Sequence, residues 1–309
     1  MLVSAMISVT GCASPALDDD DDDDGGGLFV PGDSAPTMDD CAAWLADQHD
    51  PSQPAVCSEQ DGEPDWRAEI VAAGAVVYPV SADRYATVWL PEAWAFGDPL
   101  LYIVHNTDGC GEQLSSLWDR ARGENALGFV SISYRAPGSE QFDPEGIVYD
   151  NLTTVHDALE LHCPISASPK AYYGFSRGAA RAYGISFLDR AAEAPFLDTF
   201  IIDSGTAPVS AGGAAPDALE GARFWMWCGE RDPDPVNAGE TICDTMRGSL
   251  APLLSSFGGS VDALVANEDG CHGMLFDCGQ TCADCRPHDG PTQGDLPELF
   301  RYLSTLSPQ

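Results

Sequence analysis

The nine residues from Tyr172 to Ala180 read Tyr-Tyr-Gly-Phe-Ser-Arg-Gly-Ala-Ala. An aromatic run, the pattern G-x-S-x-G and small residues in this order are typical of a strand, a sharp turn and a helix that lift a serine out of a sheet as a nucleophile. At such a strained turn, a side chain at Gly174 or Gly178 would collide with the neighbouring strand or helix. With 31 glycines in the chain, about 0.2 matches are expected by chance. The pattern makes Ser176 a candidate nucleophile, and the rest of the chain must support it.

The length and charge of the chain narrow the class of protein. A chain of 309 residues, 44% of them hydrophobic, is long enough for one large α/β domain or two small ones. Its formal net charge is −35, and about −28 remains when the seven carboxylates of Asp18–Asp24 are set aside. Such an acidic body argues against nucleic acid and anionic membrane surfaces as partners.

The cysteines indicate the compartment. The chain has 11 of them, which is natural for an exported protein and unusual for a reduced cytosolic enzyme. Cys12 follows the short apolar segment Met1–Gly11, which ends in Val-Thr-Gly and resembles the signal of a bacterial lipoprotein, although no Lys or Arg precedes it. The segment is too short for a transmembrane helix. We therefore expect an exported cell-envelope lipoprotein held to the membrane by lipidation of Cys12, or alternatively a secreted protein, in which the other cysteines form disulfides.

Composition divides the chain into four parts. They are a lipoprotein-type signal peptide (1–11), a disordered acidic tether (12–37), a small cysteine-bearing segment (38–74) and the main domain (75–309). The tether is expected because adjacent carboxylates repel one another and no apolar pattern could be buried. In the small segment, Cys41 and Cys57 flank an apolar stretch, so we expect a short helix closed by a local disulfide.

Strands and helices alternate in the main domain. Runs rich in β-branched and aromatic residues predict strands at 75–78, 85–90, 100–104, 128–133, 171–173, 199–203, 224–228 and 261–265. Helices are expected at 147–161, 177–191, 242–257 and 297–306. This alternation predicts an α/β fold with a mainly parallel central sheet and helices on both faces.

A serine nucleophile needs a base within hydrogen-bond reach and a third group that orients the base. When the serine lies on a turn of this kind, the acid and then the histidine follow it along the chain. Only His272 and His288 follow Ser176. His272 comes shortly after the last predicted strand, at the edge of the sheet where reactive groups gather in open α/β folds. We therefore expect His272 to be the base, and His288 is the weaker choice.

The acid should follow the preceding strand, where Gly-Glu-Arg-Asp-Pro-Asp supplies Asp232 and Asp234. We favour Asp232 over Asp234. A calcium loop formed by Asp232, Asp234, Asn237 and Glu240 is a second interpretation, but two prolines and the missing central glycine fit it poorly. No metal or cofactor is expected.

An oxyanion hole requires two backbone N–H groups directed at the developing charge. One should belong to Arg177, directly after the nucleophile. The other should come from the loop after the third strand, where Asn106 and Thr107 are the candidates. His105 precedes the serine, so it is expected to be structural.

These residues carry a resemblance to a known family. From about Ala75 to its end the chain resembles an α/β-hydrolase, and more narrowly the secreted feruloyl esterases and polyhydroxyalkanoate depolymerases. The matching pieces are 109–113, a helix ending at Pro164, 169–173 and 174–178. The resemblance implies the α/β-hydrolase fold and hydrolysis of a small-molecule or polymeric ester through an acyl-enzyme, without a cofactor. A serine peptidase or acyltransferase with the same triad, and a non-catalytic surface binding protein, are the alternatives.

The cysteines near the C-terminus have two interpretations. Cys271, Cys278, Cys282 and Cys285 could form a zinc site with nearby histidines. Only one C-x-x-C is present and the expected compartment is oxidising, so disulfides are favoured.

Overall fold

The structure of the chain is a computed structural model that describes residues 35–55, 65–107, 109–135, 141–207, 214–268 and 296–306. The described residues from Pro36 onward belong to one compact unit. The helices are α1 (Met38–Gln48), α2 (Trp66–Ala72), α3 (Gly111–Arg122), α4 (Glu145–His162), α5 (Arg177–Ala191), α6 (Ile242–Thr245), the π-helix η1 (Met246–Leu250), α7 (Ala251–Ser256) and α8 (Leu296–Thr305). The strands are β1 (Val76–Ser81), β2 (Arg84–Trp89), β3 (Leu100–Val104), β4 (Gly128–Ile132), β5 (Lys170–Phe175), β6 (Thr199–Asp203), β7 (Arg223–Gly229) and β8 (Ser260–Asn267).

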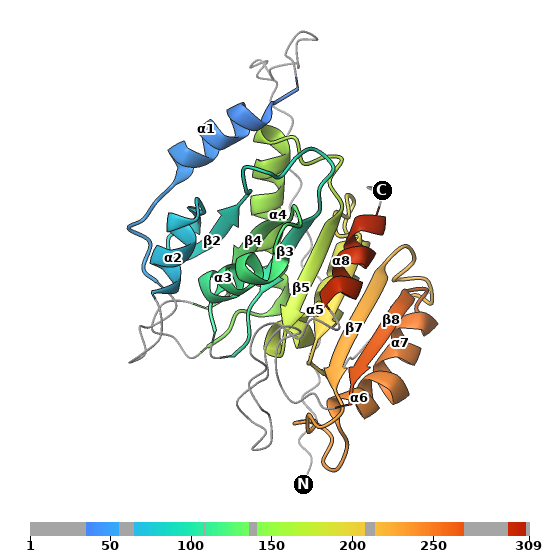
Figure 1. Cartoon of the computed structure of the whole chain (residues 1–309). Helices are drawn as coiled ribbons and strands as arrows, with labels where there is room; N and C mark the ends of the chain where they lie inside the picture. Colours follow the sequence, from blue (N-terminus) through green and yellow to red (C-terminus); the bar gives the residue numbers. More distant parts are fainter. Residues whose placement is uncertain are drawn as a thin grey trace, which may run out of the picture. The chain divides into compact units, whose positions relative to one another are not determined.

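The strands form an 8-stranded sheet in the order β1-β2-β4-β3-β5-β6-β7-β8 (Figure 1). The pairs β1–β2 and β2–β4 are antiparallel, and the pairs from β4 to β8 are parallel. Each predicted strand run is a strand, and the prediction of a mainly parallel sheet is confirmed. The strands β3 and β5 are neighbours with Val104 opposite Gly174, so the loop after β3 begins beside the turn after β5.

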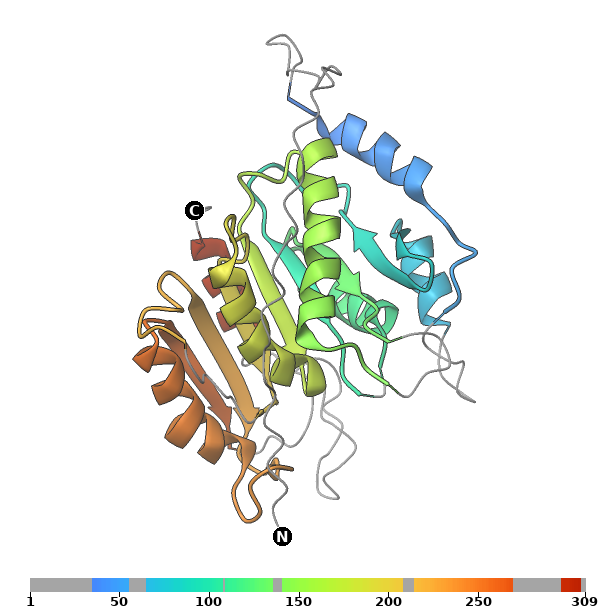
Figure 2. The same cartoon turned by 180° about the vertical axis from the view of Figure 1, so that it is seen from behind.

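Helices cover both faces of the sheet, as predicted. In Figure 1, α2, α3 and α8 lie on the face turned toward the reader, and Figure 2 shows α4 and α5 on the opposite face. Along β3, Tyr102 and Val104 belong to the core cluster that contains residues of α4 and α5. Leu101 and Ile103 belong to the cluster that contains Trp118 of α3. The strand is apolar throughout because both of its faces are buried.

The disulfides correct one expectation about the small segment. Cys41 is bonded to Cys163, 122 residues away, and not to Cys57, which lies outside the described residues. The reason is tertiary packing: α1 lies against the C-terminal end of α4, where the rings of Trp44 and His162 stack with centroids 4.5 Å apart. A second disulfide, Cys228–Cys243, joins the end of β7 to α6. Both bonds fit an oxidising compartment.

The predicted helix at 242–257 is present but irregular. It consists of α6, the π-helix η1 and α7 in direct succession. Pro252 lies at the start of α7, and because proline has no N–H to donate to the preceding turn, the regular i→i−4 pattern cannot pass through it. The helix α3 was not predicted from the sequence.

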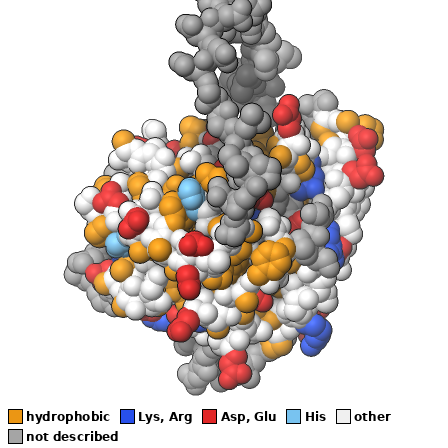
Figure 3. Space-filling view, turned by 90° about the horizontal axis from the view of Figure 1, so that it is seen from above, with side chains coloured by type: hydrophobic (Ala, Val, Ile, Leu, Met, Phe, Trp, Pro, Cys, Tyr) orange, Lys and Arg blue, Asp and Glu red, His pale blue; other side chains and the backbone are white. Residues whose placement is uncertain are grey.

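The surface reflects the acidic composition. On the face shown in Figure 3, acidic side chains are scattered among hydrophobic and polar ones, and basic side chains lie toward its rim. Among the helices in the described ranges, none has the length and apolar character needed to cross a membrane. The predicted signal peptide, Cys12 and residues 13–34 of the predicted tether lie outside those ranges.

Candidate active site

The turn between β5 and α5 holds Ser176 in a strained conformation. Ser176 has φ 53° and ψ −110°, a region that residues with a side chain rarely adopt and that is enriched at functional sites. The helix α5 begins at the next residue, and the Ser176 side chain makes no capping hydrogen bond to it. The hydroxyl is therefore not used as a helix cap, although serine favours that role.

The two glycines of the turn are required by close packing, as predicted. A β-carbon at Gly174 would lie 2.4 Å from the backbone carbonyl group of Gly178. A β-carbon at Gly178 would lie 2.0 Å from the carbonyl oxygen of Val104, at the end of β3. The nucleophile turn is thus in direct contact with the start of the loop that is expected to supply the second oxyanion donor.

A pocket of about 550 Å³ opens beside Ser176. Its described lining residues are Thr107, Glu145, Ser176, Arg177, Ala180, Arg181, Ser204, Gly205, Thr206, Ala207, Pro235 and Ile242. They come from the loops after β3, β5, β6 and β7 and from the N-terminal parts of α4 and α5. The pocket therefore lies at the carboxyl ends of the parallel strands, where ligands bind in open α/β sheets. The structure thus brings together Ser176 and two of the predicted oxyanion residues, Arg177 and Thr107.

A second serine of the pocket was missed by the sequence analysis. Ser204 directly follows β6 and also has φ 53°. A β-carbon at the next residue, Gly205, would lie 2.3 Å from the carbonyl oxygen of Ser176, so this turn packs against the nucleophile turn. The available signal was the run Asp-Ser-Gly-Thr immediately after a buried strand.

The two acid candidates differ in their surroundings. Asp234 Oδ1 accepts hydrogen bonds from the backbone N–H groups of Val236 and Asn237 at 2.6 and 3.2 Å and from the Thr206 hydroxyl at 3.2 Å. Its Oδ2 accepts from the Thr245 hydroxyl at 2.5 Å and from Asn237 Nδ2 at 3.2 Å. Both oxygens are therefore engaged in holding the loop together.

These hydrogen bonds also set the charge of Asp234. Burial raises the pKa of this carboxyl, but the hydrogen bonds from Thr245 and from the backbone of Val236 and Asn237 outweigh burial, so the pKa is below its usual value. Asp234 is therefore charged at neutral pH and supports the loop in that form. The described residues contain no group of three or more His, Cys, Asp or Glu side chains arranged to hold a metal ion.

Asp232 lies at the base of the same loop and is 1% exposed. Its backbone N–H donates to the Gly229 carbonyl at 3.2 Å, and its carbonyl accepts from Ile242 N–H at 2.8 Å, so its position is fixed from both sides. Both predicted acids are therefore on the loop after β7, and the Asp234 carboxylate supports that loop. Asp232 remains the predicted acid.

The predicted base, His272, and the weaker choice, His288, lie outside the described residues, as do Cys271, Cys278, Cys282 and Cys285. The described chain reaches Glu268, directly after β8. The end of β8 is paired with the end of β7 at Asn267 and Gly229, and the Glu230 N–H donates to the Asn267 carbonyl at 2.9 Å. The chain therefore leaves β8 beside the loop that carries Asp232.

His105, at the start of the loop after β3, is structural as expected. Its side chain is fully buried, and its Nδ1 lies 2.8 Å from the Asn106 carbonyl oxygen. Burial lowers the pKa of His105 to about 3, so the imidazole is neutral over the physiological range. The Tyr134 hydroxyl donates to the His105 carbonyl at 2.9 Å, which holds the backbone at the entrance to this loop.

The two oxyanion candidates on this loop are placed differently. Thr107 Oγ1 accepts from Arg177 Nε at 3.3 Å, so Thr107 is linked to the residue after the nucleophile. Asn106 turns its side-chain oxygen toward Gly109, where a β-carbon would lie 2.0 Å from Asn106 Oδ1. Both backbone N–H groups remain candidates for the second donor, and Thr107 is the one that lines the pocket.

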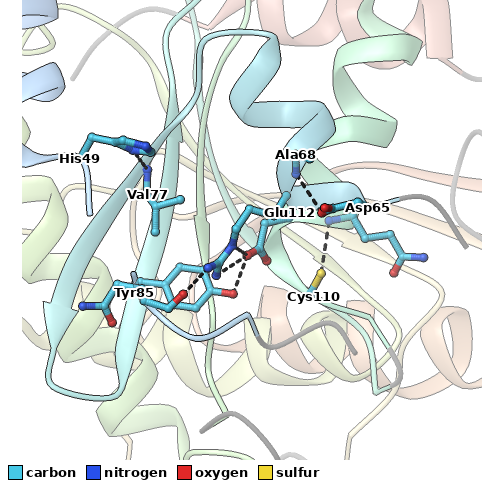
Figure 4. A network of polar contacts seen from close by, with 10 residues as sticks. His49, Asp65, Ala68, Val77, Tyr85, Cys110 and Glu112 are labelled. Carbon is cyan, nitrogen blue, oxygen red and sulfur yellow. Dashed lines mark hydrogen bonds and ion pairs between the residues drawn. The ribbon is translucent and has the colours of Figure 1, made fainter. Parts of the chain in front are cut away.

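A buried charged network, shown in Figure 4, anchors the helix that follows this loop. Glu112, in the first turn of α3, is 1% exposed and accepts hydrogen bonds on Oε1 from the Tyr85 hydroxyl at 2.5 Å and from Arg67 at 2.9 and 3.0 Å. Burial and the Glu112 charge raise the pKa of Tyr85 well above its usual value, so Tyr85 stays a neutral donor. The network fixes α3, and with it one end of the loop carrying Asn106 and Thr107, to β2 and α2. Its residues were not predicted, because their spacing in the sequence reveals nothing of their contact.

Solved structures of esterases resemble this chain in fold. No family model matches the chain, and no curated protein matches it. A fungal esterase from Rhizomucor miehei is 14% identical, with a TM-score of 0.53 over 88% of this chain and 98% of its own. Esterase 2 of Thermogutta terrifontis is 16% identical, with a TM-score of 0.50 over 75% of this chain and 94% of its own. Likeness at these identities establishes the fold. With its mainly parallel 8-stranded sheet and Ser176 on the strained turn between β5 and α5, the chain has the α/β-hydrolase fold.

Proposed function

We propose that the protein is an exported serine hydrolase that cleaves carboxylic esters through Ser176, His272 and Asp232. The observation that carries the proposal is the position of Ser176: it occupies a strained turn at φ 53° and lines a pocket of about 550 Å³. Strain of this kind is retained where a side chain must be presented for chemistry. The esterases with the same fold lend the proposal further support.

The mechanism follows from the roles of the three side chains. His272 accepts the proton of the Ser176 hydroxyl while its oxygen attacks the ester carbonyl carbon, and the imidazolium then donates the proton to the departing alcohol. Asp232 orients the imidazole and stabilises its charged form. Water, deprotonated by the same histidine, cleaves the acyl-enzyme and restores Ser176.

Two backbone donors stabilise the tetrahedral intermediates in this proposal. The Arg177 N–H belongs to the first residue of α5, where N–H groups have no partner within the helix and where the helix dipole favours negative charge. The second donor is the N–H of Thr107 or Asn106, held in place by the contact of Gly178 with the end of β3. Removing one such donor typically costs about 10²–10³ in kcat.

The finer proposal for the substrate is an ester of the feruloyl or polyhydroxyalkanoate type, supported by the resemblance of residues 109–113 and 174–178. A serine peptidase or acyltransferase would use the same triad, and a panel of esters, amides and alcohol acceptors separates these activities. Export through a signal ending at Cys12 is part of the proposal and is supported by the disulfides Cys41–Cys163 and Cys228–Cys243.

The nucleophile is tested with a fluorophosphonate probe, which labels activated serines covalently. We expect the probe to label Ser176, as located by peptide mass spectrometry, and Ser176→Ala to lose labelling and several orders of magnitude of ester hydrolysis. Ser204→Ala is the matched control, because Ser204 lines the same pocket with the same φ. Labelling that persists in Ser176→Ala and disappears in Ser204→Ala would reassign the nucleophile.

A further inference from the structure

We propose that the pocket accepts esters that carry a free carboxylate a few atoms from the scissile bond, and that Arg177 and Arg181 bind this carboxylate. The inference rests on the proposed function and names the substrate class for the same site. It was not apparent from the sequence, because the positions of the pocket residues depend on segments that follow five different strands.

The charge of the pocket lining is opposite in sign to that of the whole protein. The chain has 14 Lys and Arg against 49 Asp and Glu, yet Arg177 and Arg181 both line the pocket, and among its described lining residues Glu145 is the one carboxylate. The described lining therefore carries a formal charge of +1 in a strongly acidic protein. A positively charged pocket in a negatively charged protein attracts anionic ligands. A charge of +1 matches a ligand with a single negative charge.

The contacts of the Arg177 guanidinium hold it in place and leave its terminal nitrogens available. Its guanidinium carbon lies 4.3 Å from the centroid of the Phe142 ring, and its Nε donates to the Thr107 hydroxyl at 3.3 Å. Within the described part of the chain, its two Nη groups have no hydrogen-bond partner and no carboxylate forms an ion pair with it. An aromatic face and one hydrogen bond thus hold the guanidinium in place while its terminal donors are available.

Arg181 lies one turn farther along α5 and adds a second guanidinium. Its Nη1 pairs with Glu145 Oε1, and its Nε is buried without a hydrogen-bond partner among the described residues. The side chain as a whole is 21% exposed and lines the pocket, so its guanidinium can contact a carboxylate that binds there. Residues at i and i+4 of a helix lie about 6 Å apart on the same face, so the two arginines can act on one ligand group.

The chemistry favours a carboxylate. The planar fork of a guanidinium matches the two oxygens of a carboxylate. The N-terminal end of α5, from which Arg177 projects, adds partial positive charge beside Ser176. The anionic group would then lie near the reacting carbonyl, where it positions the ester for attack.

The test compares two esters that differ only in charge. They are 4-nitrophenyl hydrogen adipate, whose far end is a carboxylate, and methyl 4-nitrophenyl adipate, whose far end is neutral. We expect kcat/KM of the full-length wild-type protein to be about tenfold higher for the charged ester, as for one charge-assisted contact in a partly exposed site. The preference should shrink at 0.5 M salt by roughly half or more, because exposed charges are screened.

Variants identify the residues responsible. Arg177→Gln and Arg181→Gln should each lower the charged-to-neutral ratio of kcat/KM toward unity, whereas Glu145→Gln should raise it about threefold by removing the opposing charge. We use the charged-to-neutral ratio of kcat/KM because a change in the shape of the turn that carries Ser176 would affect both esters alike. Arg120→Gln is the control: Arg120 is exposed on α3 and paired with Glu69, outside the pocket, and the ratio should not change.

The outcomes separate this inference from the proposed function. If the wild type hydrolyses neither ester, or if Ser176→Ala hydrolyses both normally, the proposed function fails. If the wild type hydrolyses both esters equally well through Ser176, only the carboxylate site is overturned. If Arg177→Gln is inactive toward both esters, the carboxylate site is judged from two other results. It stands if salt reduces the preference of the wild type for the charged ester and Glu145→Gln raises the charged-to-neutral ratio of kcat/KM, and it is overturned if neither changes.

Discussion

Gly178, on the turn that presents the nucleophile, is packed directly against the carbonyl oxygen of Val104, at the end of β3. A β-carbon at position 178 would lie 2.0 Å from this oxygen, well inside the distance that two such atoms tolerate. The contact couples the two halves of the proposed site, because α5 carries the Arg177 N–H and the loop after Val104 carries Asn106 and Thr107, the candidates for the second oxyanion donor.

Gly178→Ala should therefore lower both stability and activity. Because the obstructing atom belongs to the backbone, it cannot move aside as a side chain would, and we expect a loss of about 1–3 kcal/mol in the free energy of unfolding with a lower kcat. Gly146→Ala is the control, because a β-carbon there meets nothing within 4 Å, and the change should be neutral or slightly stabilising. Denaturant unfolding and ester kinetics check both variants, and equal stability of the two would contradict the steric account.

The loop after β7 allows the acid to be identified by two parallel substitutions. Asp232→Asn should lower kcat by about 10⁴-fold, because an amide cannot orient and stabilise the histidine as a carboxylate does. Asp234→Asn should mainly destabilise the protein, because it introduces an NH₂ group where the carboxylate accepts hydrogen bonds from Thr206, Thr245 and the backbone. The reverse pattern, a crippled but stable Asp234→Asn protein, would move the acid two residues along the chain.

The Asp234 interaction also has a definite pH dependence. The pKa of its carboxyl is lower in the folded protein than in the unfolded chain, so it stabilises the fold above the unfolded pKa of about 3.9 and loses this effect as the pH falls through the folded pKa. The stability difference between wild type and Asp234→Asn should thus be largest at neutral pH and narrow toward pH 2.

The strands and the nucleophile turn could be predicted because their signals are local. The runs at 100–104 and 171–173 are apolar over consecutive residues, and Gly174 and Gly178 are required by the turn itself. The disulfide Cys41–Cys163 could not be predicted, because it depends on how α1 packs against α4, and a spacing of 122 residues carries no signal.

The same distinction holds within the site. The candidates Ser176, Arg177 and Thr107 were found from motif and chain order, and the structure places all three at one pocket. The role of Asp234 as a loop support could not be inferred, since its donors Thr206 and Thr245 are 28 and 11 residues away in sequence. Glu112 lies within the stretch 109–113 that resembles the esterases, and its burial against Tyr85 and Arg67 becomes evident only in three dimensions.

The proposed lipid anchor is tested at Cys12. Cys12→Ala should move the protein from the membrane fraction to the soluble fraction, because the acidic body has no favourable interaction with anionic lipid. The controls are Cys41→Ala and Cys163→Ala, which remove a disulfide and should leave the distribution between fractions unchanged. A Cys12→Ala protein that stays with the membrane would show that lipidation at this residue is not the anchor.

The proposed base sets the pH dependence of activity. His272 must be neutral to accept the Ser176 proton, so kcat/KM should fall as the pH drops through its pKa, around 6.5 for an ordinary histidine. His105 cannot cause this limb, because burial lowers its pKa to about 3. His272→Asn should abolish hydrolysis, whereas His288→Asn should retain both the activity and the acid limb. A flat profile between pH 5 and 8 would contradict a histidine base.

A second buried histidine makes a prediction about stability. His156, on α4, lies with Nδ1 2.8 Å from the Tyr102 hydroxyl and stacks on the Phe196 ring at a centroid distance of 4.1 Å. Burial lowers the pKa of His156 to about 3, against about 6.5 in the unfolded chain. Between these two values the unfolded state binds one proton more than the folded state, so this residue makes stability fall as the pH falls.

His156 contributes about 1.4 kcal/mol per pH unit to the decline of the free energy of unfolding between roughly pH 6 and 4. His156→Gln keeps a polar partner for Tyr102 and removes the titrating group, so it should flatten the decline by that amount, even if the variant is less stable than the wild type at pH 7.5. The comparison cancels His105 and the carboxylates that do not contact His156, which titrate alike in both proteins; Glu160, whose Oε2 lies 3.8 Å from His156 Nε2, is half exposed and contributes little. Denaturant unfolding at several pH values measures the two slopes. Parallel curves for the wild type and His156→Gln would mean that His156 accepts a proton in the folded state as readily as in the unfolded chain, and that its burial against Tyr102 and Phe196 does not hold it neutral.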